Sequence, residues 1–110
     1  MKIKVTTTYD GFGVEREVRT GERHKITLNS LVELTKKYSD FPEQHFCAGD
    51  IFHNMPREGR GVPRDVNWNL QPYVCAGFAH RIRLGMYSRK IYAYRANLDK
   101  LAEIKAEIKS

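Results

Sequence analysis

Residues 69–95, NLQPYVCAGFAHRIRLGMYSRKIYAYR, are the stretch that decides the predicted fold. An apolar residue recurs at every fourth position, at Leu70, Val74, Phe78 and Ile82. That spacing is typical of the buried stripe of an α-helix. Asn67 or Asn69 can cap the start of the helix, and Gly85 follows its last turn as a stop signal. The sequence therefore predicts a helix that begins near Asn67 and ends at residue 84.

A short β-hairpin is predicted directly after this helix, over residues 86–95. Its tip is expected at residues 87–90, Tyr-Ser-Arg-Lys, and residues 91–94 show the alternation of a strand. Upstream, residues 56–66 read PREGRGVPRDV, and their two prolines and two glycines exclude regular structure. This basic loop follows a second predicted helix at residues 43–54.

The N-terminal part of the chain is predicted to form a second hairpin and a further helix. Residues 2–20 combine polar and β-branched residues around the turn signal at residues 10–13, Asp-Gly-Phe-Gly. Residues 30–33, Ser-Leu-Val-Glu, match a capping box. They predict a helix over residues 30–38, with residues 24–26 as a connector or short strand.

The C-terminal part is predicted to be a helix over residues 97–109, capped by Asn97. Its apolar face consists of Leu98, Leu101, Ile104 and Ile108. Such a face packs either on the core of the same chain or on another subunit. A homodimer through Leu101, Ile104 and Ile108 is therefore one candidate assembly.

The order of these elements over residues 30–95 resembles the winged helix-turn-helix superfamily. The motif HFCAGDIFHNM, followed by the opening stretch NLQPYVCAGFAHRIRLGMYSRKIYAYR, carries the resemblance. The loop at residues 56–66 is longer than the turn usual in that superfamily, and the N-terminal hairpin is an addition. The prediction is one α+β domain over residues 1–110. It has a β-hairpin (1–20), a winged-helix-like three-helix core with a β-wing (30–95) and a C-terminal helix (97–109).

The net charge of +6 is concentrated in one segment. Residues 57–95 hold eight Lys or Arg against two acids, whereas residues 1–56 and 96–110 each sum to zero. Seven of the eight cations are arginines, whose planar guanidinium suits phosphates and guanine edges. This excess indicates a polyanionic partner, although a merely solubilising surface is the simpler alternative.

The resemblance implies that the third helix enters the major groove of DNA and that the wing tip contacts an adjacent groove or the backbone. Amide and hydroxyl side chains at the helix start can read base edges or bind phosphate, and the cations suit phosphate. The predicted DNA-binding residues are Arg57, Arg60, Arg64, Asn67, Asn69, Gln71, Tyr73, Arg81, Arg83, Arg89 and Lys90. Four aromatics lie among them: Trp68, Tyr87, Tyr92 and Tyr94. They could stack on single-stranded bases, but we favour core packing or cross-strand pairing.

No convincing catalytic or metal site is found in the sequence. His45, Cys47, His53 and Cys75 match no zinc-binding spacing. Asp50 with His53 could be a catalytic pair or a surface contact, and Cys75 with His80 is poorly spaced for a helical dyad. We therefore expect no enzymatic activity, no metal and no cofactor, with both cysteines reduced and buried.

Three functions remain open. The first is a DNA-binding regulator of transcription or of a mobile element or phage, with double-stranded DNA as its partner. The alternative is a phage-type inhibitor that binds a host or defence protein complex through its basic surface, and the third is an RNA- or ribosome-associated factor. Since there is no long apolar run and no secretory signal, a cytoplasmic location without membrane contact is expected.

Overall fold

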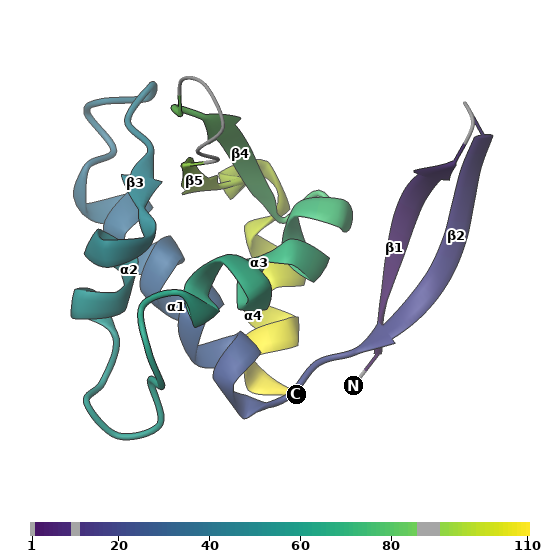
Figure 1. Cartoon of the computed structure of the whole chain (residues 1–110), viewed down its shortest axis with the longest axis horizontal. Helices are drawn as coiled ribbons and strands as arrows, with labels where there is room; N and C mark the ends of the chain where they lie inside the picture. The colour runs from purple at the N-terminus through teal and green to yellow at the C-terminus, as the bar shows by residue number, and fades with distance from the viewer. Residues whose placement is uncertain (1, 10–11, 86–90) are drawn as a thin grey trace.

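The computed structural model describes residues 2–9, 12–85 and 91–110, which form an α+β fold (Figure 1). The elements are β1 (Lys2–Tyr9), β2 (Phe12–Arg19), α1 (Glu22–Lys37), β3 (Phe46–Cys47), α2 (Ala48–Asn54), α3 (Asp65–Cys75), β4 (Ala79–Arg83), β5 (Tyr92–Ala96), the 3-10 turn η1 (Leu98–Lys100) and α4 (Leu101–Lys109). The strands form a two-stranded sheet, β1-β2, and a three-stranded antiparallel sheet in the order β3-β5-β4. No described helix is long and apolar enough to cross a bilayer.

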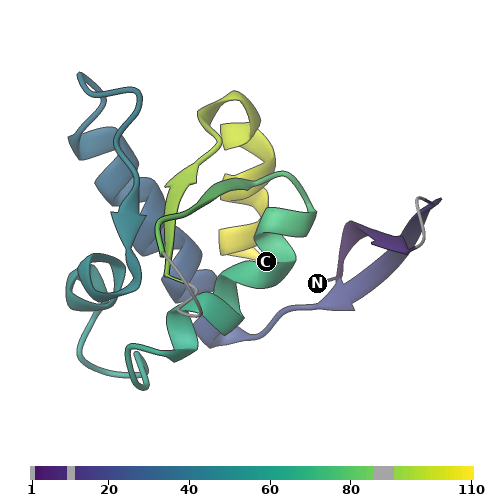
Figure 2. The ribbon, with the colours of Figure 1, turned by 45° about the horizontal axis from the view of Figure 1, so that its top comes forward.

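The predicted N-terminal hairpin is confirmed. β1 and β2 pair antiparallel from Lys2 opposite Arg19 to Tyr9 opposite Phe12. Ile3 and Val5 are buried in the core, so the base of the hairpin is packed against the rest of the chain. Figures 1 and 2 both show the hairpin projecting from one side of the body formed by the helices and the second sheet.

The first helix is longer than predicted, because α1 begins at Glu22 and includes residues 24–26. The predicted capping box at Ser30 is wrong: this serine is buried in mid-helix, and its Oγ donates a 2.8 Å hydrogen bond to the carbonyl of Ile51 in α2. The true start is at Gly21, whose N–H donates to Nδ1 of His24 over 3.1 Å. A buried serine that faces another helix carries the same local signal as a serine that caps one.

The second predicted helix, residues 43–54, is confirmed only over its last part, since α2 comprises Ala48–Asn54. Phe46 and Cys47 instead form β3 and pair with Tyr94 and Ala93 of β5. Asp50 accepts a hydrogen bond from the N–H of Cys47 over 3.3 Å and so marks the helix start. The two-residue strand exists because of a partner far along the chain, which local periodicity does not reveal.

The third helix ends much earlier than predicted. α3 stops at Cys75, and Gly77 adopts a φ of 82°, a left-handed conformation that favours glycine and terminates helices. The N–H of Phe78 then donates to the carbonyl of Tyr73 over 2.8 Å. The four-residue apolar spacing therefore runs across a helix end. Phe78 is buried at the turn, while Ile82 is exposed on a strand.

Residues 79–83, predicted to be helical, form β4 and pair with β5 from Ala79 opposite Ala96 to Arg83 opposite Tyr92. The hairpin after the third helix is therefore longer than the predicted 86–95. The predicted tip at residues 87–90, with Arg89 and Lys90, lies outside the described residues. In chain order, α1 is followed by a short strand, two helices and this hairpin.

The predicted C-terminal helix is confirmed, with its first turn in the 3-10 form as η1. Asn97 caps that turn by accepting a hydrogen bond from the N–H of Asp99 over 3.2 Å. Ile104 is fully buried, and Leu101 and Ile108 pack partly buried against the same core. This apolar face packs on the core of its own chain, with Leu101 and Ile108 only partly covered, and the dimer stays a prediction.

A buried carboxylate joins three parts of the fold. Oε2 of Glu107 in α4 accepts hydrogen bonds from Thr20 Oγ1, at the end of the hairpin, over 2.7 Å and from the Tyr73 hydroxyl, in α3, over 2.6 Å. Both Glu107 and Tyr73 have no exposed surface. Burial, together with the Glu107 carboxylate, raises the pKa of Tyr73 well above its ordinary range. Through these bonds α4 is linked both to α3 and to the end of the hairpin.

Candidate nucleic-acid interface

The outer face of α3 is an exposed helical surface that carries several of the predicted DNA-binding residues. Val66, Leu70 and Tyr73 are buried, so the helical repeat turns the opposite side to solvent. That side carries Trp68, whose side chain is 77% exposed, and Gln71, with Asn67 and Cys75 half-buried at its edges. Arg64 is exposed immediately before the helix begins.

An open groove of about 510 Å³ lies between α3 and the β4–β5 hairpin. It is lined by Asn67, Trp68, Gln71, Arg81, Tyr92 and Tyr94. The Arg81 guanidinium donates a 2.5 Å hydrogen bond to Oε1 of Gln71 and lies 4.6 Å from the ring centroid of Tyr92. The stacked, hydrogen-bonded arginine is thereby held beside the helix.

A second polar contact crosses the same groove. The Tyr94 hydroxyl donates a 2.8 Å hydrogen bond to Oδ1 of Asn67. Burial raises the pKa of Tyr94 above its ordinary value of 10.0, and the nearby Arg81 charge opposes that rise. The hydroxyl therefore keeps its proton at neutral pH and remains a donor. The sheet and α3 are thus linked by two hydrogen bonds that hold the side chains lining the groove.

Another groove, of about 420 Å³, lies on the opposite side of the outer face of α3, against the N-terminal hairpin. Its lining comprises Val5, Arg16, Val18, Arg19, His24, Trp68, Gln71, Pro72 and Cys75. Trp68 and Gln71 line both grooves. The outer face of α3 is therefore a ridge between two grooves, each of which contains at least one arginine.

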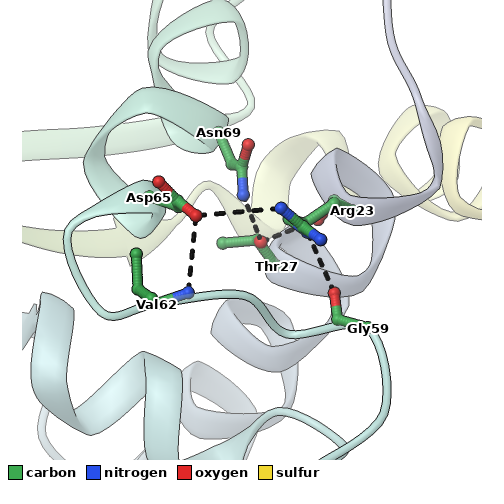
Figure 3. A network of polar contacts seen from close by, with 6 residues as sticks. All are labelled: Arg23, Thr27, Gly59, Val62, Asp65 and Asn69. Atoms are coloured by element: carbon green, nitrogen blue, oxygen red, sulfur yellow. Dashed lines mark hydrogen bonds and ion pairs between the residues drawn. The ribbon is translucent and has the colours of Figure 1, made fainter.

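The basic loop before α3 is held in place from α1 (Figure 3). Arg23 donates through Nε to the carbonyl of Gly59 over 3.1 Å and forms an ion pair with Asp65 at 3.8 Å. Oδ2 of Asp65 also accepts a 3.4 Å hydrogen bond from the N–H of Val62. Gly61 has a φ of 72°, and a Cβ there would lie 2.8 Å from the Asp65 carboxylate. The turn beside α3 therefore requires glycine.

This arrangement leaves most of the loop's positive charge unneutralised. Asp65 is one of the two acids in residues 57–95, and its ion pair is with Arg23 of α1. Among the described residues, Arg57, Arg64 and Arg81 form no ion pair. Arg60 is half-buried, with its guanidinium 4.4 Å from the ring centroid of Phe52. Unpaired guanidinium groups beside the helix are suited to phosphate.

Two of the predicted DNA-binding residues are wrong, because they lie on the buried face of α3. Asn69 is 5% exposed, and its Nδ2 donates to Thr27 Oγ1 over 3.3 Å (Figure 3). Tyr73 is fully buried on Glu107. With α3 starting at Asp65, the core stripe passes through Val66 and Leu70, and positions 69 and 73 fall on it.

The other predicted residues within the described ranges have exposed surface. Asn67, Gln71 and Arg81 meet in one groove, and Arg83 is exposed on β4 two residues beyond Arg81. Arg57, Arg60 and Arg64 belong to the preceding loop. Arg95, one of the eight cations, instead donates to the backbone carbonyls of Phe41 and Pro42 and ties down a loop.

From the sequence, Trp68 was considered as a stacking residue but a packing role was preferred, and Arg16 and Arg19, which line a groove beside α3, were not considered. The preference for core packing of the aromatics holds for Tyr94, which is fully buried, but is wrong for Trp68. Counting helical positions from Val66 places residue 68 off the core stripe, so the correct helix start would have revealed it. Arg16 and Arg19 escaped notice because the N-terminal half has no net charge.

Within the described ranges, no group of three or more His, Cys, Asp or Glu side chains is arranged to hold a metal ion. Comparison with protein-family models, with curated proteins and with solved structures finds no match to this chain.

Proposed function

We propose that this protein is a winged-helix DNA-binding regulator, acting on transcription or on a mobile element, that binds duplex DNA through the outer face of α3. The observation that carries the proposal is the juxtaposition on one surface of Gln71 and Asn67 with the unpaired guanidinium groups of Arg64 and Arg81. Amide side chains suit base edges, and arginines suit phosphates and guanine.

The topology supports a winged-helix assignment. α1, β3, α2, α3 and the β4–β5 hairpin follow one another in the chain, and β3 pairs with the last strand, β5. The hairpin lies next to α3 and shares the groove that contains Arg81. In a winged helix, the third helix and the hairpin act together on DNA in this way.

The groups in the groove keep donors for a ligand despite their mutual contacts. A guanidinium has five N–H donors, and Arg81 uses one of them on Gln71. Nε2 of Gln71 points to the Cys75 thiol at 3.6 Å, which is a weak acceptor that a base edge or phosphate can replace. The intramolecular bonds therefore orient the side chains without exhausting them.

Salt dependence of duplex binding tests the proposal. The logarithm of the association constant should fall linearly with the logarithm of salt concentration, by about 0.9 per phosphate contact. The double variant Arg64→Glu/Arg81→Glu should weaken binding strongly and reduce the slope by about two contacts. Lys36→Glu, an equal charge reversal per site at the end of α1, is the control and should change neither. Binding without a negative salt slope would rule out phosphate contact.

The second candidate, an inhibitor that binds a protein complex, is favoured by one observation. Ile82, Leu84 and Ile91 are each at least 40% exposed where β4 leads into the hairpin. Adjacent apolar and cationic side chains suit an acidic protein surface. In that case Ile82→Ser/Leu84→Ser would abolish capture of the partner complex, while the duplex assay above would show no specific affinity.

A further inference from the structure

Trp68 exposes a large apolar side chain to water and is not part of the hydrophobic core. It is the single tryptophan of the chain, and its side chain is 77% exposed in the middle of α3. Tryptophans are usually largely buried, and when exposed they are enriched at binding surfaces. On the same helix, Tyr73 has no exposed surface, so α3 itself imposes no exposure on aromatics.

The surroundings of Trp68 are cationic on both sides. The hairpin groove holds Arg16 and Arg19 of β2, and the sheet groove holds Arg81. The hairpin groove also contains apolar side chains, Val5, Val18 and Pro72. A flat apolar ridge bordered by guanidinium groups is the combination that binds a nucleotide, with the base stacked on the ring and the phosphate on arginine.

Paired bases cannot use this ridge. In an intact duplex the base faces are covered by their neighbours, and the grooves offer only base edges. An indole face can stack only where a base is unpaired or at the end of a strand. An apolar protein segment would fill the hairpin groove equally well, but it would leave Arg16 and Arg81 without a countercharge.

We propose that Trp68 stacks on an unpaired nucleobase, and that the preferred ligand is therefore duplex DNA with an adjoining single-stranded segment. This inference rests on the proposed nucleic-acid interface at α3 and specifies which structure that interface selects. The duplex contacts the α3 and β4–β5 side, and the single strand follows the cationic hairpin groove past Arg16.

The intrinsic fluorescence of the protein reports this contact directly, because Trp68 is its only tryptophan. The full chain is titrated with a blunt duplex, with the same duplex carrying a single-stranded overhang, and with the single strand alone. Emission should be quenched much more strongly by the overhang and the single strand than by the blunt duplex, whose only open base faces are those of its terminal pairs. Binding to the overhang should also be tighter than to the blunt end.

Variants assign the preference to the indole ring. Trp68→Ala should weaken overhang binding by between about 5-fold and about 150-fold, the range for loss of one stacked base. Blunt-duplex binding should weaken by a smaller factor than overhang binding, because Trp68 also lies on the outer face of α3. Trp68→Phe should retain part of the preference. Phe41→Ala removes another aromatic that is 61% exposed, in the loop after α1, and serves as the matched control with no effect expected.

The outcomes separate the two proposals. If all three DNAs bind with equal affinity and a normal salt slope while the emission of Trp68 is unchanged, the duplex interface stands and the stacking inference fails. Equal quenching by blunt and overhang DNA would likewise overturn the preference for unpaired bases. If none of the DNAs binds in a salt-dependent manner, the proposed function itself fails. Quenching of the unmutated protein is decisive even if a variant does not fold.

Discussion

The two faces of α3 differ in what their side chains contact. The inner face carries Asn69 and Tyr73, whose polar atoms are committed to Thr27 and Glu107 inside the core. The outer face carries Trp68 and Gln71, which line two grooves and add little to the core. The indole ring of Trp68 is therefore exposed, whereas the hydroxyl of Tyr73 and the amide of Asn69 are buried.

That reversal shows why residue type alone misleads at an interface. Prediction from side-chain chemistry assigned Asn69 and Tyr73 to DNA and favoured core packing or cross-strand pairing for Trp68. Burial instead follows the helical repeat, which places Asn69 and Tyr73 on the same side as the core residues Val66 and Leu70. A polar group can be buried where it has a hydrogen-bond partner, and an aromatic ring can be exposed where it serves as a binding surface.

The largest expected effect contrasts the two aromatics on the two faces. Tyr73→Ala should lower the free energy of unfolding by about 3–5 kcal/mol, because it empties a fully buried site and leaves Glu107 with one donor fewer. Trp68→Ala should change it by less than about 0.5 kcal/mol, as expected at an exposed surface. Denaturant unfolding followed by circular dichroism measures both. Similar losses for the two variants would contradict the assignment of the faces.

A smaller contrast uses the two amides. Asn69→Ala removes the hydrogen bond to Thr27 and should cost about 1–3 kcal/mol of folding free energy with little effect on DNA affinity. Gln71→Ala should leave stability almost unchanged, since Gln71 is exposed, but weaken duplex binding. Chemical denaturation and DNA titration of the same two preparations provide the test. If Asn69→Ala lost DNA affinity without losing stability, Asn69 would have to contact DNA directly, contrary to its assignment to the inner face.

The elements with strong local signals could be predicted from the sequence. The N-terminal hairpin has alternation and a glycine-rich turn, and the C-terminal helix has a cap and a continuous apolar face. The strand over residues 91–94 was also predicted, although β5 begins one residue later and ends two residues later, at Ala96. In each case the pattern that makes the element is contained within it.

The elements that failed depend on contacts between distant residues. β3 has two residues and exists through its pairing with β5. The end of α3 was missed because Phe78 and Ile82 continue a helical spacing by coincidence, although Gly77 supplies a stop signal. This one error moved Arg81 and Arg83 from strand to helix. Arg81 still lines a groove with α3, because β4 turns back beside that helix.

The sequence predicted which types of residue gather at the candidate site, but not which individual residues lie there. The Arg excess in residues 57–95 pointed to the loop and to residues of β4, and Asn67, Gln71 and Arg81 line one groove in the structure. Arg16 and Arg19 join the surface only because the hairpin folds against α3. Charge counted along the chain cannot detect cations that are brought together by tertiary structure.

The smallest effect concerns His24, which lines the hairpin groove and also contacts the inner-face residue Tyr73 edge-on, with ring centroids 6.5 Å apart. Burial lowers the pKa of His24 below its ordinary value of 6.5, an effect that the Glu107 charge opposes. Its Nδ1 also accepts from the N–H of Gly21, which a proton on that atom would prevent. The neutral imidazole is therefore the form that belongs to the folded state.

The sign of the pH effect follows from this lowered pKa. Above pH 6.5 His24 is neutral in both states and its contribution to stability is complete. As pH falls below 6.5 the unfolded chain takes up the proton first, so that contribution is progressively lost. His24→Gln can still accept from Gly21 at the third helical position but does not titrate. The wild type should therefore lose stability relative to His24→Gln as pH falls from 7 to about 5 in denaturant titrations, within the range where the imidazole titrates. If the stability difference between the wild type and His24→Gln stays constant across that range, His24 is exposed to solvent in the folded state and the assignment to a partly buried position is wrong.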